Sequence, residues 1–104
     1  MHSSEMESAD AADPVAYQEI RRLVIDWLDD NFHFGDAETL IQSDDRSFLD
    51  NGILASLGFV QLIVYLEDKY KFTIERKDLS RENFDSMSKI VTYVLRHKDF
   101  RRAA

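Results

Sequence analysis

A turn-rich loop gives way to an apolar helix at Ile53-Leu54-Ala55-Ser56-Leu57-Gly58-Phe59, with one serine at the junction. The first turn of an α-helix has backbone N–H groups without partners inside the helix, and it carries the positive end of the helix dipole. An anion esterified to Ser56 would therefore be stabilised electrostatically. The junction is a candidate attachment site for a phosphate-linked prosthetic group.

The helix that begins at Ala55 or Ser56 is expected to end near Lys71, and it is apolar around most of its circumference. A surface helix usually carries a single apolar stripe, but apolar side chains occupy nearly every azimuth from Leu57 to Leu66. The helix must therefore be covered on more than one side, either by the rest of a bundle or by a partner on its outward face. For each residue taken singly, the core is the expected location.

Two amphipathic helices flank this one in the sequence. Asp13-Pro14 is typical of a helix start and predicts a helix over about 14–31, with Trp27 in the core. Near the other end, Asp85 or Ser86 is expected to cap a final helix that runs to about His97. Apolar residues in that helix recur at i, i+3, i+4, i+7 and i+8, which is the spacing of one buried face.

A long connection over 32–54 and a polar segment over 75–83 join these helices. The polar segment predicts a short third helix. The sequence therefore predicts an all-α fold, a small four-helix bundle with three longer helices, one short helix and a long first loop. Apolar residues expected to anchor the two segments to the core are Phe34, Leu40, Ile41, Phe48, Leu49, Ile53, Leu79 and Phe84.

The length of 104 residues gives room for one small domain with one core. Residues 1–13 are rich in Ser, Ala and acids without apolar periodicity, which predicts a disordered leader. Residues 14–98 are expected to form the folded domain, and residues 99–104 a frayed tail.

Composition excludes several classes of function. The net charge is −7 and no basic stripe is present, which argues against nucleic-acid binding. No apolar run approaches the roughly 20 residues of a membrane span, and the acidic N-terminus is unlike a secretory signal, so a cytoplasmic protein that does not enter membranes is expected. The chain has no cysteine, and its three histidines, His2, His33 and His97, lack ligand spacing, so no metal site is expected.

The chain contains, in order, a long helix, a long loop that ends in Ser47-Phe48-Leu49-Asp50-Asn51-Gly52-Ile53-Leu54, and a helix that opens on Ser-Leu-Gly. Phe72-Thr73-Ile74 and a short helix follow, and then Glu82-Asn83-Phe84-Asp85-Ser86. In this order the chain resembles the acyl carrier protein family, specifically its small stand-alone members, from about Ile20 to Arg96.

The resemblance implies 4′-phosphopantetheine as a covalent cofactor, because Ser56 stands where family members attach this arm through a phosphodiester. It implies Leu57 as an apolar residue that partner enzymes touch, and Gln61 and Val64 as partner-binding residues further along the same helix. The implied function is to hold acyl or aminoacyl groups as thioesters on the thiol of the arm, without a catalytic side chain. The implied partners are a phosphopantetheinyl transferase, an acyl- or aminoacyl-activating ligase and downstream acyl-processing enzymes, which a monomer would visit in turn.

Two features depart from the family pattern. The residue before the attachment serine is usually aspartate, and here it is Ala55. If this position caps the helix, alanine costs about 0.5–2 kcal/mol relative to aspartate, unless Ser56 supplies the cap. Family members also carry acids along the outer face of this helix, whereas this chain reaches Glu67 and Asp68 only late, so docking is expected to depend on apolar contact more than on charge.

The missing aspartate leaves an alternative open. The chain could keep the carrier fold and work through the same helix as an interaction module that is never modified. A hydrolase of the Ser/His/Asp type is not indicated, since no nucleophile-elbow motif is present.

Overall fold

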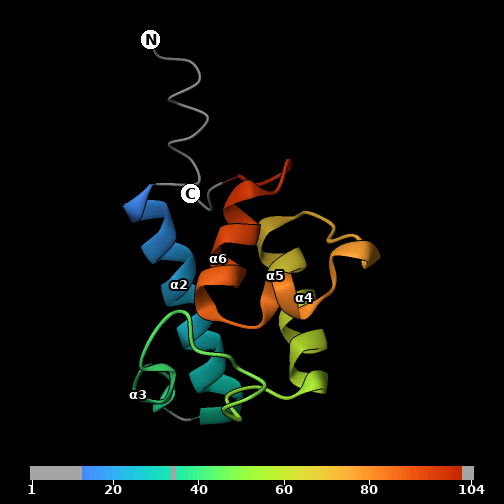
Figure 1. Cartoon of the computed structure of the whole chain (residues 1–104). Helices are drawn as coiled ribbons and strands as arrows, with labels where there is room; N and C mark the ends of the chain where they lie inside the picture. Colours follow the sequence, from blue (N-terminus) through green and yellow to red (C-terminus); the bar gives the residue numbers. More distant parts are fainter. Residues whose placement is uncertain (1–12, 34, 102–104) are drawn as a thin grey trace.

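The computed structural model describes residues 13–33 and 35–101, and these ranges contain three longer helices and four short helical segments (Figure 1). No strand occurs within these ranges, and the prediction of an all-α bundle is confirmed. The expected leader over 1–13 lies outside them apart from Asp13. The longer helices are α2 (Pro14–Leu28), α4 (Ser56–Tyr70) and α6 (Met87–Arg96), and the short segments are η1 (Asp29–His33), α3 (Ala37–Ile41), η2 (Arg76–Asp78) and α5 (Arg81–Phe84).

Side chains cap the first and last longer helices as their sequences predict. Asp13 Oδ1 accepts a hydrogen bond from the Val15 N–H at 2.9 Å, and Ser86 Oγ accepts one from the Lys89 N–H at 3.2 Å. The sequence predicted that the first helix ends near residue 31. The α-helix α2 ends earlier, at Leu28, and the chain continues as the π-helical turn η1. Helical backbone therefore extends to His33 with a changed hydrogen-bond register.

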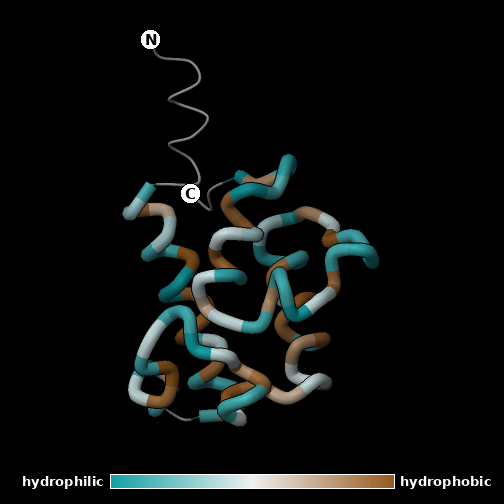
Figure 2. The backbone as a smooth tube through the Cα atoms, viewed as in Figure 1, coloured by the Kyte–Doolittle hydropathy of each residue, from teal (hydrophilic) through white to brown (hydrophobic). Residues whose placement is uncertain are grey.

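The core lies where α2 and α6 pack side by side, with α4 against them (Figure 1). Apolar and polar residues alternate around α2 and α6 in Figure 2, as in helices with one buried face. Trp27 of α2 is buried, as predicted, and stacks on Tyr65 of α4 with ring centroids 5.9 Å apart. The fully buried side chains include Ile20, Val24, Ile25, Leu28, Leu62, Leu66, Met87, Ile90, Val91 and Val94.

The long connection contains the short helix α3, which the sequence pattern did not predict. Arg21 of α2 holds this region through 3.0 Å hydrogen bonds to Glu38 of α3 and to Asp44. Of the expected anchors, Ile41, Phe48 and Ile53 are buried and Leu49 is half-buried. The prediction for Leu40 is wrong, because α3 turns Ala37 and Ile41 inward at i and i+4 and leaves Leu40 exposed; Phe34 lies outside the described residues.

The polar segment forms two short turns, η2 and α5, in place of the single short helix that was expected. Extended backbone at Ser80 (φ −149°, ψ 164°) separates the turns. Phe84 is buried, as predicted. The prediction for Leu79 is wrong: this side chain is exposed and lies beside a pocket between the segment and α4. Among the helices of the described residues, none has the length and hydropathy to cross a membrane.

Candidate functional site

Ser56 is the first residue of α4, and its side chain is exposed to solvent. Ala55 occupies the N-cap position with extended backbone (φ −93°, ψ 173°) and no side-chain hydrogen bond. The cap that an aspartate would supply is therefore missing, and Ser56, already inside the helix, does not replace it. The first turn of α4 contains no acidic residue, so nothing in that turn opposes an anion on Ser56.

The loop before Ser56 is fixed by backbone hydrogen bonds and buried side chains. Gly52 has φ +67°, as the Asn51-Gly52 turn predicts. The Phe48 carbonyl then accepts hydrogen bonds from the Ile53 N–H at 2.9 Å and the Leu54 N–H at 3.4 Å. Ile53 and Leu54 are both buried. The chain therefore enters α4 from a packed support.

Asp85 joins this loop to the short helix α5. Its side chain is only 5% exposed, and it accepts hydrogen bonds from Ser47 Oγ at 2.6 Å, the Leu49 N–H at 2.9 Å and Arg81 Nη2 at 2.7 Å. Burial acts to raise the pKa of Asp85, but the hydrogen bonds from Ser47 and Leu49 and the guanidinium of Arg81 outweigh it, so the pKa lies below its usual value. The carboxylate is held ionised at the edge of the site.

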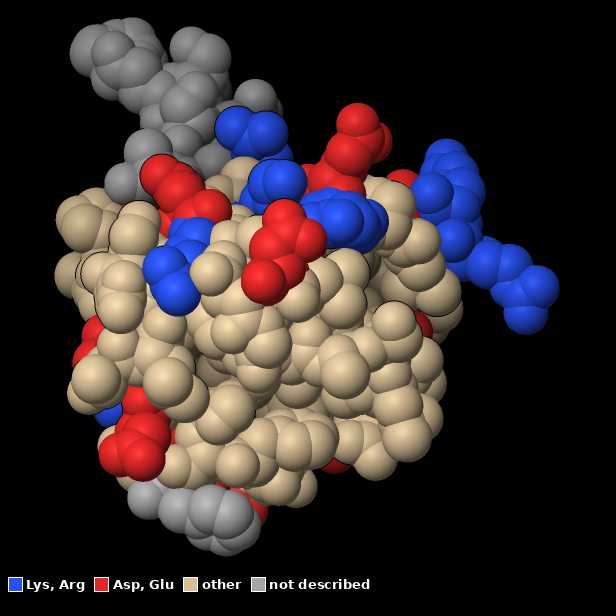
Figure 3. Space-filling view, turned by 60° about the horizontal axis from the view of Figure 1, so that its bottom comes forward, with Lys and Arg blue, Asp and Glu red and all other residues tan. Residues whose placement is uncertain are grey.

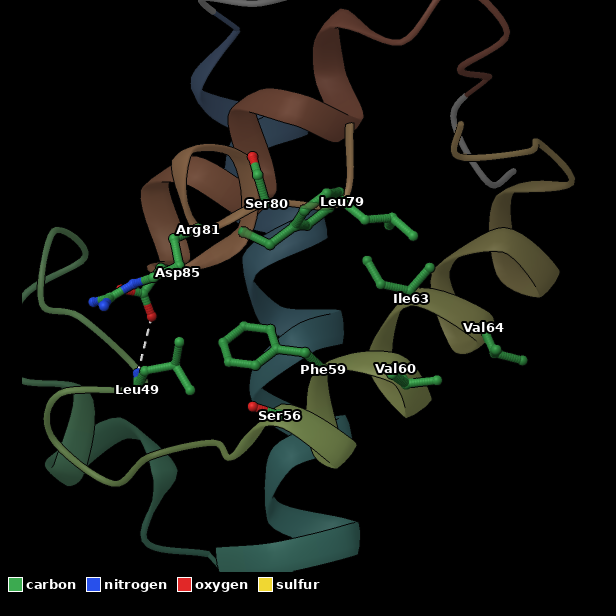
Figure 4. Close-up of a pocket in the computed structure, with 11 residues that line it drawn as sticks. Leu49, Ser56, Phe59, Val60, Ile63, Val64, Leu79, Ser80, Arg81 and Asp85 are labelled. Carbon is green, nitrogen blue, oxygen red and sulfur yellow. Dashed lines mark hydrogen bonds and ion pairs between the residues drawn. The ribbon is translucent and has the colours of Figure 1, made fainter. Parts of the chain in front are cut away.

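A pocket with a volume of about 420 Å³ opens beside Ser56, between α4 and the segment Leu79–Asp85 (Figure 4). In Figure 4, Phe59 and Ile63 extend from α4 toward this segment, and Ser56 lies at the end of the pocket near Leu49. The polar groups of Ser80, Arg81 and Asp85 are confined to the other wall. The full lining is Leu49, Ser56, Phe59, Val60, Ile63, Val64, Leu79, Ser80, Arg81, Phe84 and Asp85.

The outward face of α4 is apolar and uncharged over its first half. Leu57 is 70% exposed, Val60 59% and Val64 58%, and Gln61 lies exposed among them. The expectation that each apolar residue of this helix is in the core is therefore wrong for the first three. The helix instead has an outward apolar face. Its buried residues lie at intervals of four, which places them on one side: Gly58, Leu62, Leu66 and Tyr70.

The predicted site residues Ser56, Leu57, Gln61 and Val64 all lie on this helix, and the structure adds Val60 to them. The i, i+3, i+7 spacing of Leu57, Val60 and Val64 could have identified it. Figure 3 views the side of the molecule where α4 begins, and its central area carries few charged groups, with Lys, Arg, Asp and Glu mainly toward the edges. We call Leu57, Val60, Gln61 and Val64 the outer face of α4.

The residues present fit a phosphopantetheine arm. The hydroxyl of Ser56 is exposed for ester formation, the unpaired N–H groups of the first turn of α4 favour a phosphate, and the apolar pocket starts at the same residue. A metal site is not indicated within residues 13–33 and 35–101, because no group of three or more His, Cys, Asp or Glu side chains there could hold an ion. The two histidines in these ranges bond instead to backbone carbonyls, His33 to Ile53 and His97 to Thr73.

Comparison with known proteins identifies relatives of one kind. The chain is 33% identical over 58 residues to a D-alanyl carrier protein of Streptococcus suis, which covers 56% of this chain and 73% of the relative. It is 32% identical over 72 residues to a D-alanyl carrier protein of Streptococcus uberis, which covers 69% and 86%, respectively. A D-alanyl carrier protein of Lactobacillus acidophilus is 31% identical over 58 residues, covering 56% of this chain and 73% of the relative.

Neither a family model nor a solved structure gives a significant match. The three relatives named above are nonetheless all carrier proteins, and the helical bundle with a serine at the start of α4 agrees with them. The resemblance seen in the sequence is thereby confirmed: the chain belongs to the acyl carrier protein family, as a small carrier protein of the phosphopantetheine type.

Proposed function

We propose that residues 14–98 form a carrier domain that bears 4′-phosphopantetheine on Ser56 and presents thioester-bound acyl or aminoacyl groups to partner enzymes. The observation that carries this proposal is the exposed Ser56 hydroxyl, which stands at an uncapped helix N-terminus beside an apolar pocket. When bound, the arm supplies the thiol that holds the cargo. The chain itself then needs no catalytic residue, and tethering raises the effective concentration of cargo at each partner.

The chain's own residues have three tasks in this function. The N–H groups of the first turn of α4 stabilise the phosphodiester charge. The loop that Asp85 holds fixes the direction from which the chain enters α4. The outer face of α4 offers an apolar surface next to Ser56, where a phosphopantetheinyl transferase or a ligase would dock.

The test is the intact mass of the purified chain after incubation with coenzyme A and a permissive phosphopantetheinyl transferase. We expect the mass to increase by one phosphopantetheine group. If only Ala55→Asp gains mass, the fold is that of a carrier and Ala55 prevents modification. If neither protein gains mass, the unmodified interaction module, which the missing aspartate favours, becomes the better explanation.

The pocket favours an apolar acyl cargo over the D-alanyl group named for the relatives. Its α4 wall consists of apolar side chains apart from Ser56 itself, whereas D-alanine carries a charged ammonium that would lose hydration there. Each methylene buried contributes about 0.8 kcal/mol. The octanoyl-loaded protein should therefore unfold several degrees above the D-alanyl-loaded one in calorimetry. Equal unfolding temperatures for the two loaded forms would contradict an apolar cargo.

Partner docking should depend only weakly on salt. The outer face of α4 contains no charged side chain, and the first one in the helix is Glu67, so few charge pairs can form across the interface. We expect the Kd for the transferase to change less than about threefold between about 50 mM and 500 mM NaCl, a range over which the Debye length shortens severalfold. A change of ten times or more would show that charges outside this face control docking.

Two side-chain truncations locate the docking surface when the Kd for the transferase is measured for each. Leu57→Ala should weaken binding, because this side chain is 70% exposed next to Ser56. Val15→Ala is the matched control, since Val15 is 57% exposed but lies on α2.

A further inference from the structure

The π-helical turn η1 brings two side chains to the start of α4. Its five residues, Asp29–His33, continue α2 with an i→i+5 register. The wider turn rotates the residues that follow it relative to a continued α-helix. As a result Phe32 and His33, at its end, both reach the segment that contains Ser56, which lies more than twenty residues further along the chain.

His33 holds the chain just before Ser56. Its Nε2 lies 2.7 Å from the Ile53 carbonyl oxygen in a partly buried contact. A carbonyl can only accept, so the ring nitrogen carries the proton and donates. The bonded carbonyl belongs to a buried residue three positions before Ser56.

Phe32 lies beside Gly58, two residues after Ser56. A Cβ placed on Gly58 would lie 3.6 Å from Phe32 Cζ and only 2.5 Å from Leu54 Cδ1. Gly58 therefore allows α4 to sit directly against both side chains. His33 therefore bonds to the backbone before Ser56, and Phe32 lies next to Gly58 after it.

The loop before Ser56 is packed, but the first turn of α4 receives no support from an N-cap side chain of its own. Ala55 makes no capping bond, so a contribution that an N-cap side chain normally supplies is missing. We propose that η1 replaces this local support, and that His33 is a positioning residue that sets the backbone of Ser56 for attachment of the arm. The inference rests on the proposed function for its consequence in modification, but its structural part is measurable without any modification.

The experiment compares three variants of the full chain. His33→Leu removes the donor, and His33→Gln retains an N–H near the position of Nε2. His97→Leu is the matched control, because His97 Nε2 donates to the Thr73 carbonyl at 2.9 Å near the end of α6, away from the start of α4 (Figure 1). Amide hydrogen exchange at Ala55–Gly58 is measured by NMR on the unmodified proteins, and kcat and KM for the transferase are measured with coenzyme A.

We expect His33→Leu to speed exchange at Ala55–Gly58 several-fold and to lower kcat roughly tenfold or more, since small misplacements of a reacting group are costly. The KM for the carrier should change little, because the outer face of α4 is intact. His33→Gln should restore both values toward wild type, and His97→Leu should leave both unchanged.

Unchanged exchange at Ala55–Gly58 in His33→Leu overturns the inference, even if the wild-type chain is modified. An equal fall in kcat for His97→Leu also overturns it, since the effect would then be one of general stability. If the wild-type chain is not modified but exchange rises only in His33→Leu, the proposed function fails while the positioning role of η1 stands.

Discussion

Replacing Ser56 by alanine should abolish the gain of mass on incubation with coenzyme A and transferase, because no other atom at this helix N-terminus can form the ester. The fold should be unaffected. Ser56 is exposed, and the structure gives its side chain no hydrogen bond to another described residue. The free energy of unfolding in urea should stay within about 0.5 kcal/mol of wild type, as for most surface substitutions.

Ser43→Ala is the matched control for this loss. Ser43 is an exposed serine of the long connection, outside the pocket and outside α4. Its alanine variant should gain mass as the wild type does. Mass gain that persists in Ser56→Ala would place the arm on another residue, and loss in both variants would point to a defect in the reaction rather than in the site.

The start of α4 could be predicted because its signals are local. A positive-φ turn at Asn51-Gly52, an apolar run and a serine between them are all read within ten residues of sequence. The caps Asp13 and Ser86 are local in the same sense. These features depend on the side chain nearest the backbone and little on the rest of the fold.

The supports of the site could not be predicted because they are not local. Asp85 bonds to Leu49, 36 residues away, and His33 bonds to Ile53, 20 residues away. A single sequence gives no pairing for such contacts. The sequence did not predict the π-helical register of η1 either, and the contacts that His33 and Phe32 make from it toward the start of α4 are with residues at least twenty positions away.

The two leucines that are exposed against expectation have a different explanation. Leu40 and Leu79 each lie in a short segment with too few turns for periodicity to assign a face. For Leu79 the outcome matters to the site, because an apolar side chain that is exposed there lines the pocket facing α4. Of these two departures from the expected core, the one at Leu79 therefore contributes to the proposed functional site.

Asp85→Asn should destabilise the fold by about 2–4 kcal/mol, because it replaces a buried acceptor of several charge-assisted hydrogen bonds. An amide keeps one acceptor oxygen and turns an NH₂ toward groups that also donate, namely Ser47, Leu49 and Arg81. The loop before Ser56 would lose part of its connection to α5, while the backbone hydrogen bond from the Phe48 N–H to the Asp85 carbonyl remains. Urea unfolding at pH 7 measures the loss. Asp50→Asn is the control, because Asp50 also pairs with Arg81 but is 66% exposed, and its loss should cost less than about 0.5 kcal/mol.

The unfolding free energies of wild type and Asp85→Asn, measured as a function of pH, test the contribution of the charge of Asp85. The pKa of Asp85 is lower in the folded chain than in the unfolded chain, so its ionisation stabilises the fold above the unfolded value. This stabilisation should be complete at neutral pH and should decrease as pH falls below about 4, the ordinary range for Asp, toward the folded pKa. The difference in unfolding free energy between wild type and Asp85→Asn should narrow over that interval. A difference that stays constant down to the acid limit would mean that the shape of the side chain, rather than its charge, holds the loop that leads to Ser56.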